Sequence, residues 1–235
     1  MRAFGRVIVE EPGGGFFSYV STKKGDYVST AGRLLWHSDG QFTRTGALQA
    51  ISLYALEMER REPTIYADMV RAAAALPPAL RQRVKDLQVL QCLDFSSNLE
   101  LVRCRLSKKP PEVPDSQFPR AAHPVLGAHP FTGEEVLNVS QLFTSHVVGF
   151  TDEDSDALFA ELEPVQYDPA YIYAHPWEVH DLVVWDNIAL QHSRDMLGAP
   201  SGRKLRRVSI NPLDNAEMLH GVTPDPSLRI GAGGW

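Results

Sequence analysis

The chain has 235 residues, 43% of them hydrophobic, and a formal net charge of −6. This length and composition suit a single domain, residues 1–235, with a sizeable core, and the negative charge argues against nonspecific binding to nucleic acid or to an anionic membrane. With only Cys92 and Cys104 as cysteines, no signal-peptide pattern and no run of ~18 apolar residues, we expect a reduced, cytoplasmic protein without membrane spans.

Residues 1–32 are short-stranded and rich in glycine, with turns expected at Gly13–Gly15 and Lys23–Asp26. Residues 33–56 predict two longer strands. The first of these, Leu34–Trp36, runs directly into His37-Ser38-Asp39. Polar side chains that follow a buried strand in this way are candidates for a functional site.

His37 and Asp39 lie on the same face of the predicted strand, because successive side chains point to opposite faces. An imidazole beside a carboxylate is two-thirds of the 2-His-1-carboxylate set that binds non-haem Fe(II) and leaves coordination positions open. The best candidate for the third ligand is His192, which follows the apolar run Leu182–Trp185. A hydrogen-bonded pair at the surface is the alternative explanation for His37 and Asp39.

The middle of the chain alternates between helical and irregular patterns. Apolar residues at helical spacing predict helical structure over residues 65–91, interrupted at Pro77-Pro78. Residues 107–120 contain four prolines and predict an exposed loop, which we expect to act as a lid over the substrate. Thr151, followed by three acidic residues, predicts a helix that runs to about Glu163 and stops before Pro164.

Residues 171–211 return to strand patterns, and we expect a loose tail from about residue 212. Strands towards both ends with helices inserted between them predict a mainly β fold. A doubly wound fold would require strands and helices in regular alternation, which the sequence lacks.

An ordered series of motifs resembles one enzyme family over roughly residues 33–211. The series is Trp36-His37-Ser38-Asp39-Gly40, His129-Pro130-Phe131-Thr132-Gly133, Trp185-Asp186-Asn187, His192, Arg203 and Arg207. It is similar to the taurine dioxygenase-like (TauD/TfdA) Fe(II)/2-oxoglutarate-dependent oxygenases. The resemblance implies a double-stranded β-helix, that is, a cupin-like jelly roll. It also implies decarboxylation of 2-oxoglutarate with O2, coupled to hydroxylation, desaturation or cyclisation of a small-molecule substrate.

The resemblance assigns roles to six residues. His37, Asp39 and His192 would bind Fe(II). Arg203 and Thr64 would hold the cosubstrate 2-oxoglutarate, and Arg207 would contact an anionic group of the substrate. No catalytic residue beyond the metal ligands is expected.

The strand pattern independently supports a pair of inward arginines. On one strand, Arg203 and Arg207 share a face, and Lys204 and Arg206 share the opposite face. Two arginines inside an apolar barrel require anionic partners, and a dicarboxylate supplies one. A solvated strand position remains the alternative for Arg203, and a structural ion pair the alternative for Arg207.

Other interpretations remain open at this stage. A non-catalytic cupin-like module would bind a metal or ligand without turnover, and a zinc hydrolase could use the same three ligands. His129 is expected in a turn, and Asp186-Asn187 is expected to shape the turn that presents His192. Gly127 stands where the family usually has a basic residue, and only 36 residues precede His37. The substrate pocket is therefore less predictable than the metal site, and a homo-oligomer stays open.

Overall fold

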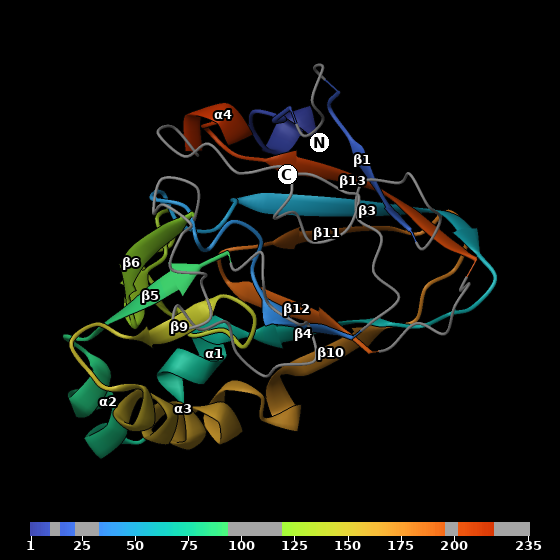
Figure 1. The fold of residues 1–235 in the computed structure, drawn as a ribbon. Coiled ribbons are helices and arrows are strands. Elements are labelled where there is room, and N and C mark those ends of the chain that lie inside the picture. The colour runs from blue at the N-terminus through green and yellow to red at the C-terminus, as the bar shows by residue number, and fades with distance from the viewer. Residues whose placement is uncertain (10–14, 22–32, 94–118, 196–201, 219–235) are drawn as a thin grey trace, which may run out of the picture.

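A computed structural model describes residues 1–9, 15–21, 33–93, 119–195 and 202–218. Two four-stranded sheets, in which all neighbouring strands are antiparallel, form the centre of the molecule (Figure 1). The first sheet has the order β1 (Ser18–Ser21), β13 (Arg203–Ile210), β3 (Ala50–Met58) and β11 (Leu182–Asp186). The second has the order β10 (Ile172–His175), β4 (Thr64–Asp68), β12 (Leu190–Arg194) and β2 (Leu34–His37).

The chain passes repeatedly from one sheet to the other. Strands β2, β3 and β4 alternate between the second and first sheets, and β10 to β13 do the same later in the chain. Neighbours within a sheet are consequently far apart in sequence, as with β13 beside β3. This winding is that of a double-stranded β-helix, so the predicted mainly β jelly roll is confirmed.

The space between the two sheets is filled by side chains that alternate along the strands. One buried cluster contains Ile51, Leu53 and Ala55 of β3, Tyr66 of β4, Trp185 of β11 and Leu205 of β13. Because this period-2 pattern is the pattern of a half-buried strand, it fixes which face of each strand looks into the barrel. The same alternation decides which polar residues enter the interior.

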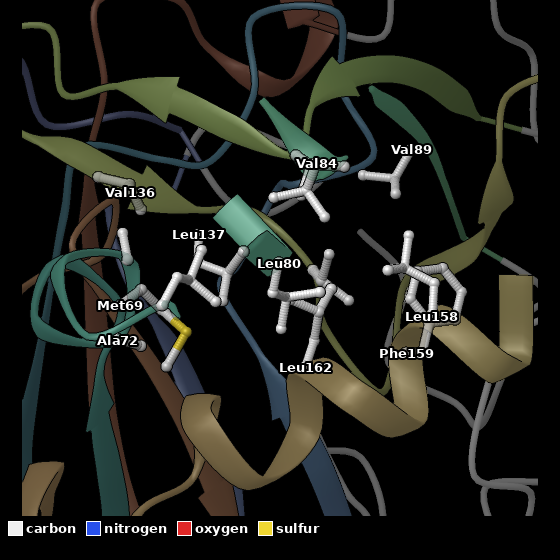
Figure 2. Close-up of a cluster of buried hydrophobic side chains, with 14 of the residues drawn as sticks. Met69, Ala72, Leu80, Val84, Val89, Val136, Leu137, Leu158, Phe159 and Leu162 are labelled. Carbon is white, nitrogen blue, oxygen red and sulfur yellow. The ribbon is translucent and has the colours of Figure 1, made fainter. Parts of the chain in front are cut away.

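A second core lies on the other side of the second sheet. Helices α1 (Met69–Ala74), α2 (Pro78–Val84) and α3 (Asp152–Gln166) gather on the side of the second sheet that faces away from the first (Figure 1). Figure 2 shows their apolar side chains meeting those of neighbouring strands, with Met69, Leu80 and Leu162 among them. The helices thus cover one face of the barrel from the outside. The polar residues described below lie on the inner side of the sheets.

Two smaller sheets and several short elements complete the described part of the chain. The smaller sheets have the orders β6 (Arg120–Pro124), β5 (Gln88–Cys92), β9 (Thr144–Val147) and β7 (Leu126–Ala128), β8 (Glu135–Leu137). The short elements are η1 (Arg2–Phe4), η4 (Pro169–Tyr171) and α4 (Asn215–Met218). None of the described helices is both long enough and apolar enough to cross a membrane.

The predicted helical stretch over residues 65–91 is partly wrong. Its middle forms α1 and α2, but its two ends are the strands β4 and β5. Ile65 faces the outer core because it alternates with Thr64 and Tyr66 on a strand, and it falls at helical spacing from Met69 only by coincidence. Here a strand, with a spacing of two residues between side chains on one face, runs directly into a helix, with a spacing of three to four. The helical spacing of the apolar residues was therefore extended too far into the strand.

The acidic helix begins where the sequence predicts and ends later. The Thr151 hydroxyl accepts a hydrogen bond from the amide of Asp154 at 3.1 Å, which confirms the N-cap. The helix does not stop before Pro164 but continues to Gln166. Buried Leu162 and Gln166 hold this last turn, and the Gln166 amide donates to the carbonyl of Val139. Tertiary packing here outweighs the local preference of proline.

The first residues of the expected tail, 213–218, contact the rest of the chain. Arg6 forms ion pairs with Asp214 and Glu217, and Met218 packs into the cluster between the sheets. Residues 219–235 lie outside the described residues. So do the expected turns at residues 13–14 and 23–26, as well as Cys104 and residues 107–118 of the expected lid, whereas Arg120 is the first residue of β6.

Candidate metal and cosubstrate site

His37 and His192 are brought together by the pairing of β2 with β12. They are direct partners across the two strands, and their ring centroids lie 4.2 Å apart. Asp39 follows two residues after His37, beyond the end of β2. Ligand atoms of these three side chains all lie within 4.8 Å of one another. The structure therefore gathers the predicted triad, although His192 comes from the far end of the sequence.

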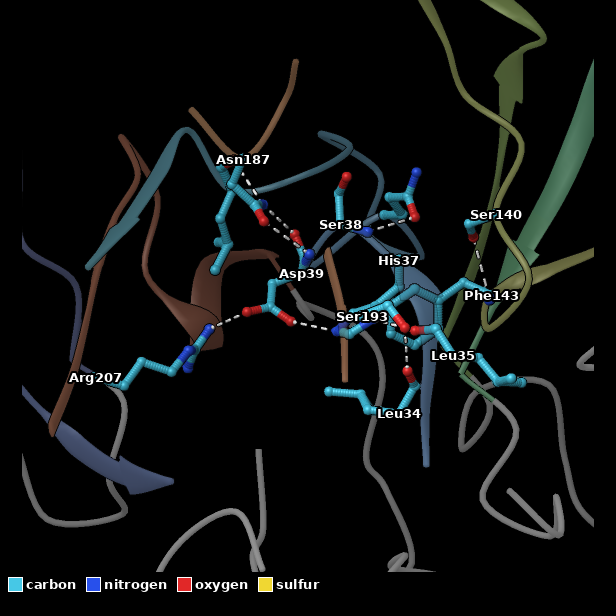
Figure 3. Close-up of polar contacts among 12 residues, drawn as sticks. Leu34, Leu35, His37, Ser38, Asp39, Ser140, Phe143, Asn187, Ser193 and Arg207 are labelled. Atoms are coloured by element: carbon cyan, nitrogen blue, oxygen red, sulfur yellow. Dashed lines mark hydrogen bonds and ion pairs between the residues drawn. The ribbon is translucent and has the colours of Figure 1, made fainter. Parts of the chain in front are cut away.

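The ring of His37 is held in one orientation by its own strand. Its Nδ1 lies 2.7 Å from the carbonyl oxygen of Leu35, and a carbonyl can only accept, so Nδ1 carries the proton. The other ring nitrogen, Nε2, points to the Asp39 carboxylate, with a separation of 3.3 Å from Oδ1 (Figure 3). Nε2 is thus the nitrogen left with a lone pair for a metal ion.

The backbone of Asp39 is clamped by the side chain of Asn187. The Asn187 amide accepts from the Asp39 N–H at 3.1 Å and donates to the Asp39 carbonyl at 3.0 Å (Figure 3). Gly40 follows with φ of +81°, a conformation that glycine adopts without strain. Asp186 accepts from the amides of Ile188 and Ala189, so the Asp186-Asn187 pair shapes the turn between β11 and β12 as expected. The direct hold of Asn187 on Asp39 was not expected from the sequence.

Arg207 contacts Asp39 from β13. Its Nη2 donates to Asp39 Oδ2 at 2.9 Å, and the two carboxylate oxygens of Asp39 therefore face different partners (Figure 3). Burial by itself would raise the pKa of the Asp39 carboxyl. The Arg207 guanidinium outweighs burial and holds this pKa well below its ordinary value. Asp39 is consequently an anion over the whole physiological range.

His192 is buried and in its neutral form. Burial lowers the pKa of His192 to about 3. The ring lies edge-on to Trp185, with centroids 5.1 Å apart, and its Nδ1 is buried with no hydrogen-bond partner in the part of the chain that the structure describes. Two imidazoles with free lone pairs and one carboxylate form a donor set suited to a divalent transition metal.

Thr64 and Arg203 meet deeper in the barrel. Arg203 Nη2 donates to Thr64 Oγ1 at 2.9 Å, and both side chains are buried. Burial, followed by the charge of Arg194, lowers the pKa of Arg203 to about 10, which leaves the guanidinium protonated at neutral pH. The resemblance assigned both residues to the cosubstrate, and the structure places them in contact. The resemblance did not indicate Arg194, a second buried arginine two residues after His192.

Trp177 is a further residue of this region that the sequence analysis missed. It is fully buried, and its indole N–H donates to Thr64 Oγ1 at 3.0 Å. The Arg203 guanidinium lies 5.9 Å from its ring centroid. With two donors occupying the oxygen of Thr64, its own hydroxyl proton is directed elsewhere. Trp177 lies in the connection between β10 and β11. A connection has no strand or helix pattern from which the contact with Thr64 could have been predicted.

The predicted faces of β13 hold despite an irregularity in the strand. Arg203 and Leu205 are buried, while Arg206 is exposed. Lys204 is half-buried, with its ammonium 4.1 Å from the ring centroid of Tyr19. The pairing of β13 with β3 shifts by one residue at a bulge between Lys204 and Leu205. The alternation of inward and outward side chains continues on both sides of this bulge.

Two further histidines, His129 and His180, lie outside the triad. His129 is buried in the turn after β7, where its Nε2 lies 3.0 Å from Asp186 Oδ2 and its Nδ1 accepts from the amides of Phe131 and Thr132. His180 lies 2.9 Å from the hydroxyl of Tyr54. Neither histidine is placed to complete the His37–Asp39–His192 group.

The family follows from comparison with known proteins. The family model described as "Taurine catabolism dioxygenase TauD, TfdA family" matches residues 2–209. The chain belongs to this family. The resemblance found in the ordered motifs is thereby confirmed, and it extends further towards the N-terminus than the motifs themselves.

Curated relatives are about a quarter identical to this chain over the aligned residues. Pentalenolactone F synthase of Streptomyces arenae is 28% identical over 183 residues, which cover 74% of this chain and 60% of the relative. The alpha-ketoglutarate-dependent 2,4-dichlorophenoxyacetate dioxygenase of Burkholderia sp. (strain RASC) is 28% identical over 178 residues, which cover 74% of this chain and 57% of the relative. The chain thus spans less than two-thirds of the length of these relatives.

A solved structure is similar in fold. AAD-2 in complex with Mn(II) and N-oxalylglycine superimposes with a TM-score of 0.63 at 26% identity, covering 75% of this chain and 68% of that one. The similarity agrees with the jelly roll described above.

Proposed function

We propose that this chain is an Fe(II)/2-oxoglutarate-dependent dioxygenase that oxidises a small molecule. The observation that carries the proposal is the grouping of His37, Asp39 and His192 within 4.8 Å at one place in the barrel. A ligand set of two imidazoles and one carboxylate leaves coordination positions open for cosubstrate and O2. Membership of the TauD, TfdA family supports the same assignment.

The three side chains are prepared to bind a metal without rearranging their protons. His37 presents Nε2, because Nδ1 is committed to the carbonyl of Leu35, and Asp39 is ionised. His192 is neutral. Bound there, Fe(II) would supply the activation of O2 that drives decarboxylation of 2-oxoglutarate and oxidation of the substrate. The protein itself fixes the direction of the ligands, chiefly through the clamp of Asn187 on Asp39.

Arg203 and Thr64 are proposed to hold the far carboxylate of 2-oxoglutarate. A buried guanidinium offers a planar pair of donors that matches a carboxylate, and Thr64 adds a hydroxyl beside it. The interior also contains buried polar atoms that have no hydrogen-bond partner among the residues described, including Trp185 Nε1 and Ser209 Oγ. A polar acid between the sheets would suit this interior better than an apolar ligand.

Arg207 is proposed to contact an anionic group of the substrate while it remains paired with Asp39. One of its two terminal nitrogens donates to Asp39, and a guanidinium has further N–H groups. The relative that acts on 2,4-dichlorophenoxyacetate by name has a carboxylate in its substrate. We infer a small anionic substrate on these grounds, with hydroxylation, desaturation or cyclisation as the outcome.

Turnover of a metabolite panel, scored by succinate release, tests this function. Carboxylates, sulfonates, sulfate esters and uncharged analogues of similar size should be compared with Fe(II), 2-oxoglutarate and ascorbate, in air and under argon. We expect succinate only with Fe(II) and O2, and faster with an anionic substrate. Product formation with Zn(II) under argon would instead identify a hydrolase. Metal and ligand binding without any turnover across the panel would identify a non-catalytic module.

A further inference from the structure

Four aromatic side chains form one row across the inner face of the second sheet. His37 is the strand partner of His192, His192 is the partner of Tyr66, and Tyr66 is the partner of Tyr173. Tyr66 therefore follows directly after the two triad histidines in this row. No role has so far been given to it.

Tyr66 also lies beside the cosubstrate anchor. Thr64 is two residues earlier on β4 and on the same face, which corresponds to a separation of ~7 Å along the strand. Arg203, bonded to Thr64, is close enough for its charge to act on Tyr66. Tyr66 thus lies between the proposed metal ligands and the proposed carboxylate anchor.

The hydroxyl of Tyr66 is buried and has no hydrogen-bond partner among the described residues. The side chain is only 4% exposed, so bulk solvent does not satisfy the group either. Buried phenol groups usually find a partner, because the unsatisfied group costs stability. An unsatisfied donor at this place indicates that its partner is a ligand.

The ring of Tyr66 is fixed by packing and not by its hydroxyl. It lies edge-on to Trp185, with centroids 5.3 Å apart, and is stacked on Tyr173 at 6.5 Å. A phenylalanine would make the same ring contacts. Burial raises the pKa of the Tyr66 phenol above its ordinary value, so the group keeps its proton and can donate a hydrogen bond. Among the described residues, Tyr66→Phe would therefore remove no hydrogen bond.

We propose that the Tyr66 hydroxyl donates a hydrogen bond to an oxygen of bound 2-oxoglutarate, as a further residue of the cosubstrate site. This inference rests on the proposed function, because it requires that the chain binds a 2-oxo acid. It deepens that function by adding a donor between the metal ligands and Arg203.

The test is the affinity for 2-oxoglutarate and N-oxalylglycine, measured under argon by calorimetry on protein loaded with Mn(II). Tyr66→Phe should raise both dissociation constants about 10-fold or more, because a hydrogen bond to a carboxylate is lost. Tyr173→Phe is the matched control, since this exposed tyrosine belongs to the same row and the same stack. Its dissociation constants should stay within about twofold of the unmodified protein.

A second readout separates binding from folding. Without ligand, the melting temperature of Tyr66→Phe should equal or exceed that of the unmodified protein, because a buried unsatisfied group has been removed. Unchanged affinity for both acids in Tyr66→Phe, with normal Mn(II) binding, would overturn the inference alone. Failure of the unmodified protein to bind either acid with any divalent metal would overturn the proposed function as well.

Discussion

At the scale of single residues, individual hydrogen bonds and ion pairs fix the orientation and the charge of the proposed metal ligands. His37 is oriented by the carbonyl of Leu35, and Asp39 is ionised beside Arg207. Each of these effects acts on one side chain through one contact at hydrogen-bond distance. Substitutions that remove a single contact therefore test the assignments separately.

Arg203 offers the sharpest test of the cosubstrate anchor. Arg203→Ala should weaken binding of 2-oxoglutarate by roughly 10- to 100-fold, since a charged hydrogen bond is worth ~1.5–3 kcal/mol. Arg203→Lys keeps the charge but loses the planar pair of donors, and it should give an intermediate affinity. The measurement is anaerobic calorimetry with Mn(II). Exposed Arg206, on the opposite face of the same strand, is the control. Equal affinity in Arg203→Ala and Arg206→Ala would reject the assignment.

Trp177 is expected to position Thr64 through its indole N–H. Trp177→Phe keeps an aromatic ring under Arg203 but removes the 3.0 Å hydrogen bond to Thr64 Oγ1. We expect a several-fold higher KM for 2-oxoglutarate with kcat nearly unchanged, because the cosubstrate is bound less well while all metal ligands are kept. Trp177→Phe and Thr64→Val should not be additive, since both remove the same contact. Full additivity in the double variant would exclude this role.

At the scale of elements, the turn after β2 decides where Asp39 points. Gly40 has φ of +81°, and a Cβ there would lie 3.3 Å from Leu48 Cγ. Gly133 has a similar φ of +75°, but a Cβ there would meet no atom within 4 Å. The two glycines therefore have the same backbone requirement in different surroundings.

Alanine at these glycines separates backbone strain from site geometry. Gly40→Ala and Gly133→Ala should each lower the free energy of unfolding by about 1–2 kcal/mol, the cost of a left-handed conformation. Only Gly40→Ala should also weaken Mn(II) binding, because it displaces the turn that holds Asp39. Denaturant unfolding and metal titration measure the two effects. Equal metal affinity in both variants would show that this turn does not control the ligand.

The sequence was most informative where chemistry is local. His37 and Asp39 could be placed on one face because strand alternation relates residues two positions apart. Thr151 could be named as a helix cap because capping also depends only on the next few residues. His192 was named as a candidate from the apolar run before it, and the resemblance to a family added support, but its pairing with His37 spans most of the chain and could not be read from local pattern. Trp177 and Asn187 were missed as partners of Thr64 and Asp39, because only the folded connections between strands bring them there.

At the scale of the whole molecule, metal binding and stability should be linked. Because the three ligands come from β2, the turn after it and β12, a metal ion ties together segments that are far apart in the sequence. At a Mn(II) concentration 100 times the dissociation constant, the gain is about 2.7 kcal/mol, which corresponds to a rise in Tm of about 5–10 °C. His192→Ala should abolish this rise. His146→Ala, outside the triad on β9, should keep it. A rise of equal size in His192→Ala would place the metal elsewhere.

The central claim is that the triad uses iron and O2 to decarboxylate 2-oxoglutarate. It is tested most directly by loading the protein under argon with one equivalent each of Fe(II) and isotopically labelled 2-oxoglutarate, admitting O2, and counting labelled succinate per chain. We predict Fe(II)- and O2-dependent succinate approaching one per chain in the unmodified protein, and none with Zn(II) or in His192→Ala. Intact 2-oxoglutarate after exposure to O2, or the same yield in His192→Ala, would contradict the account.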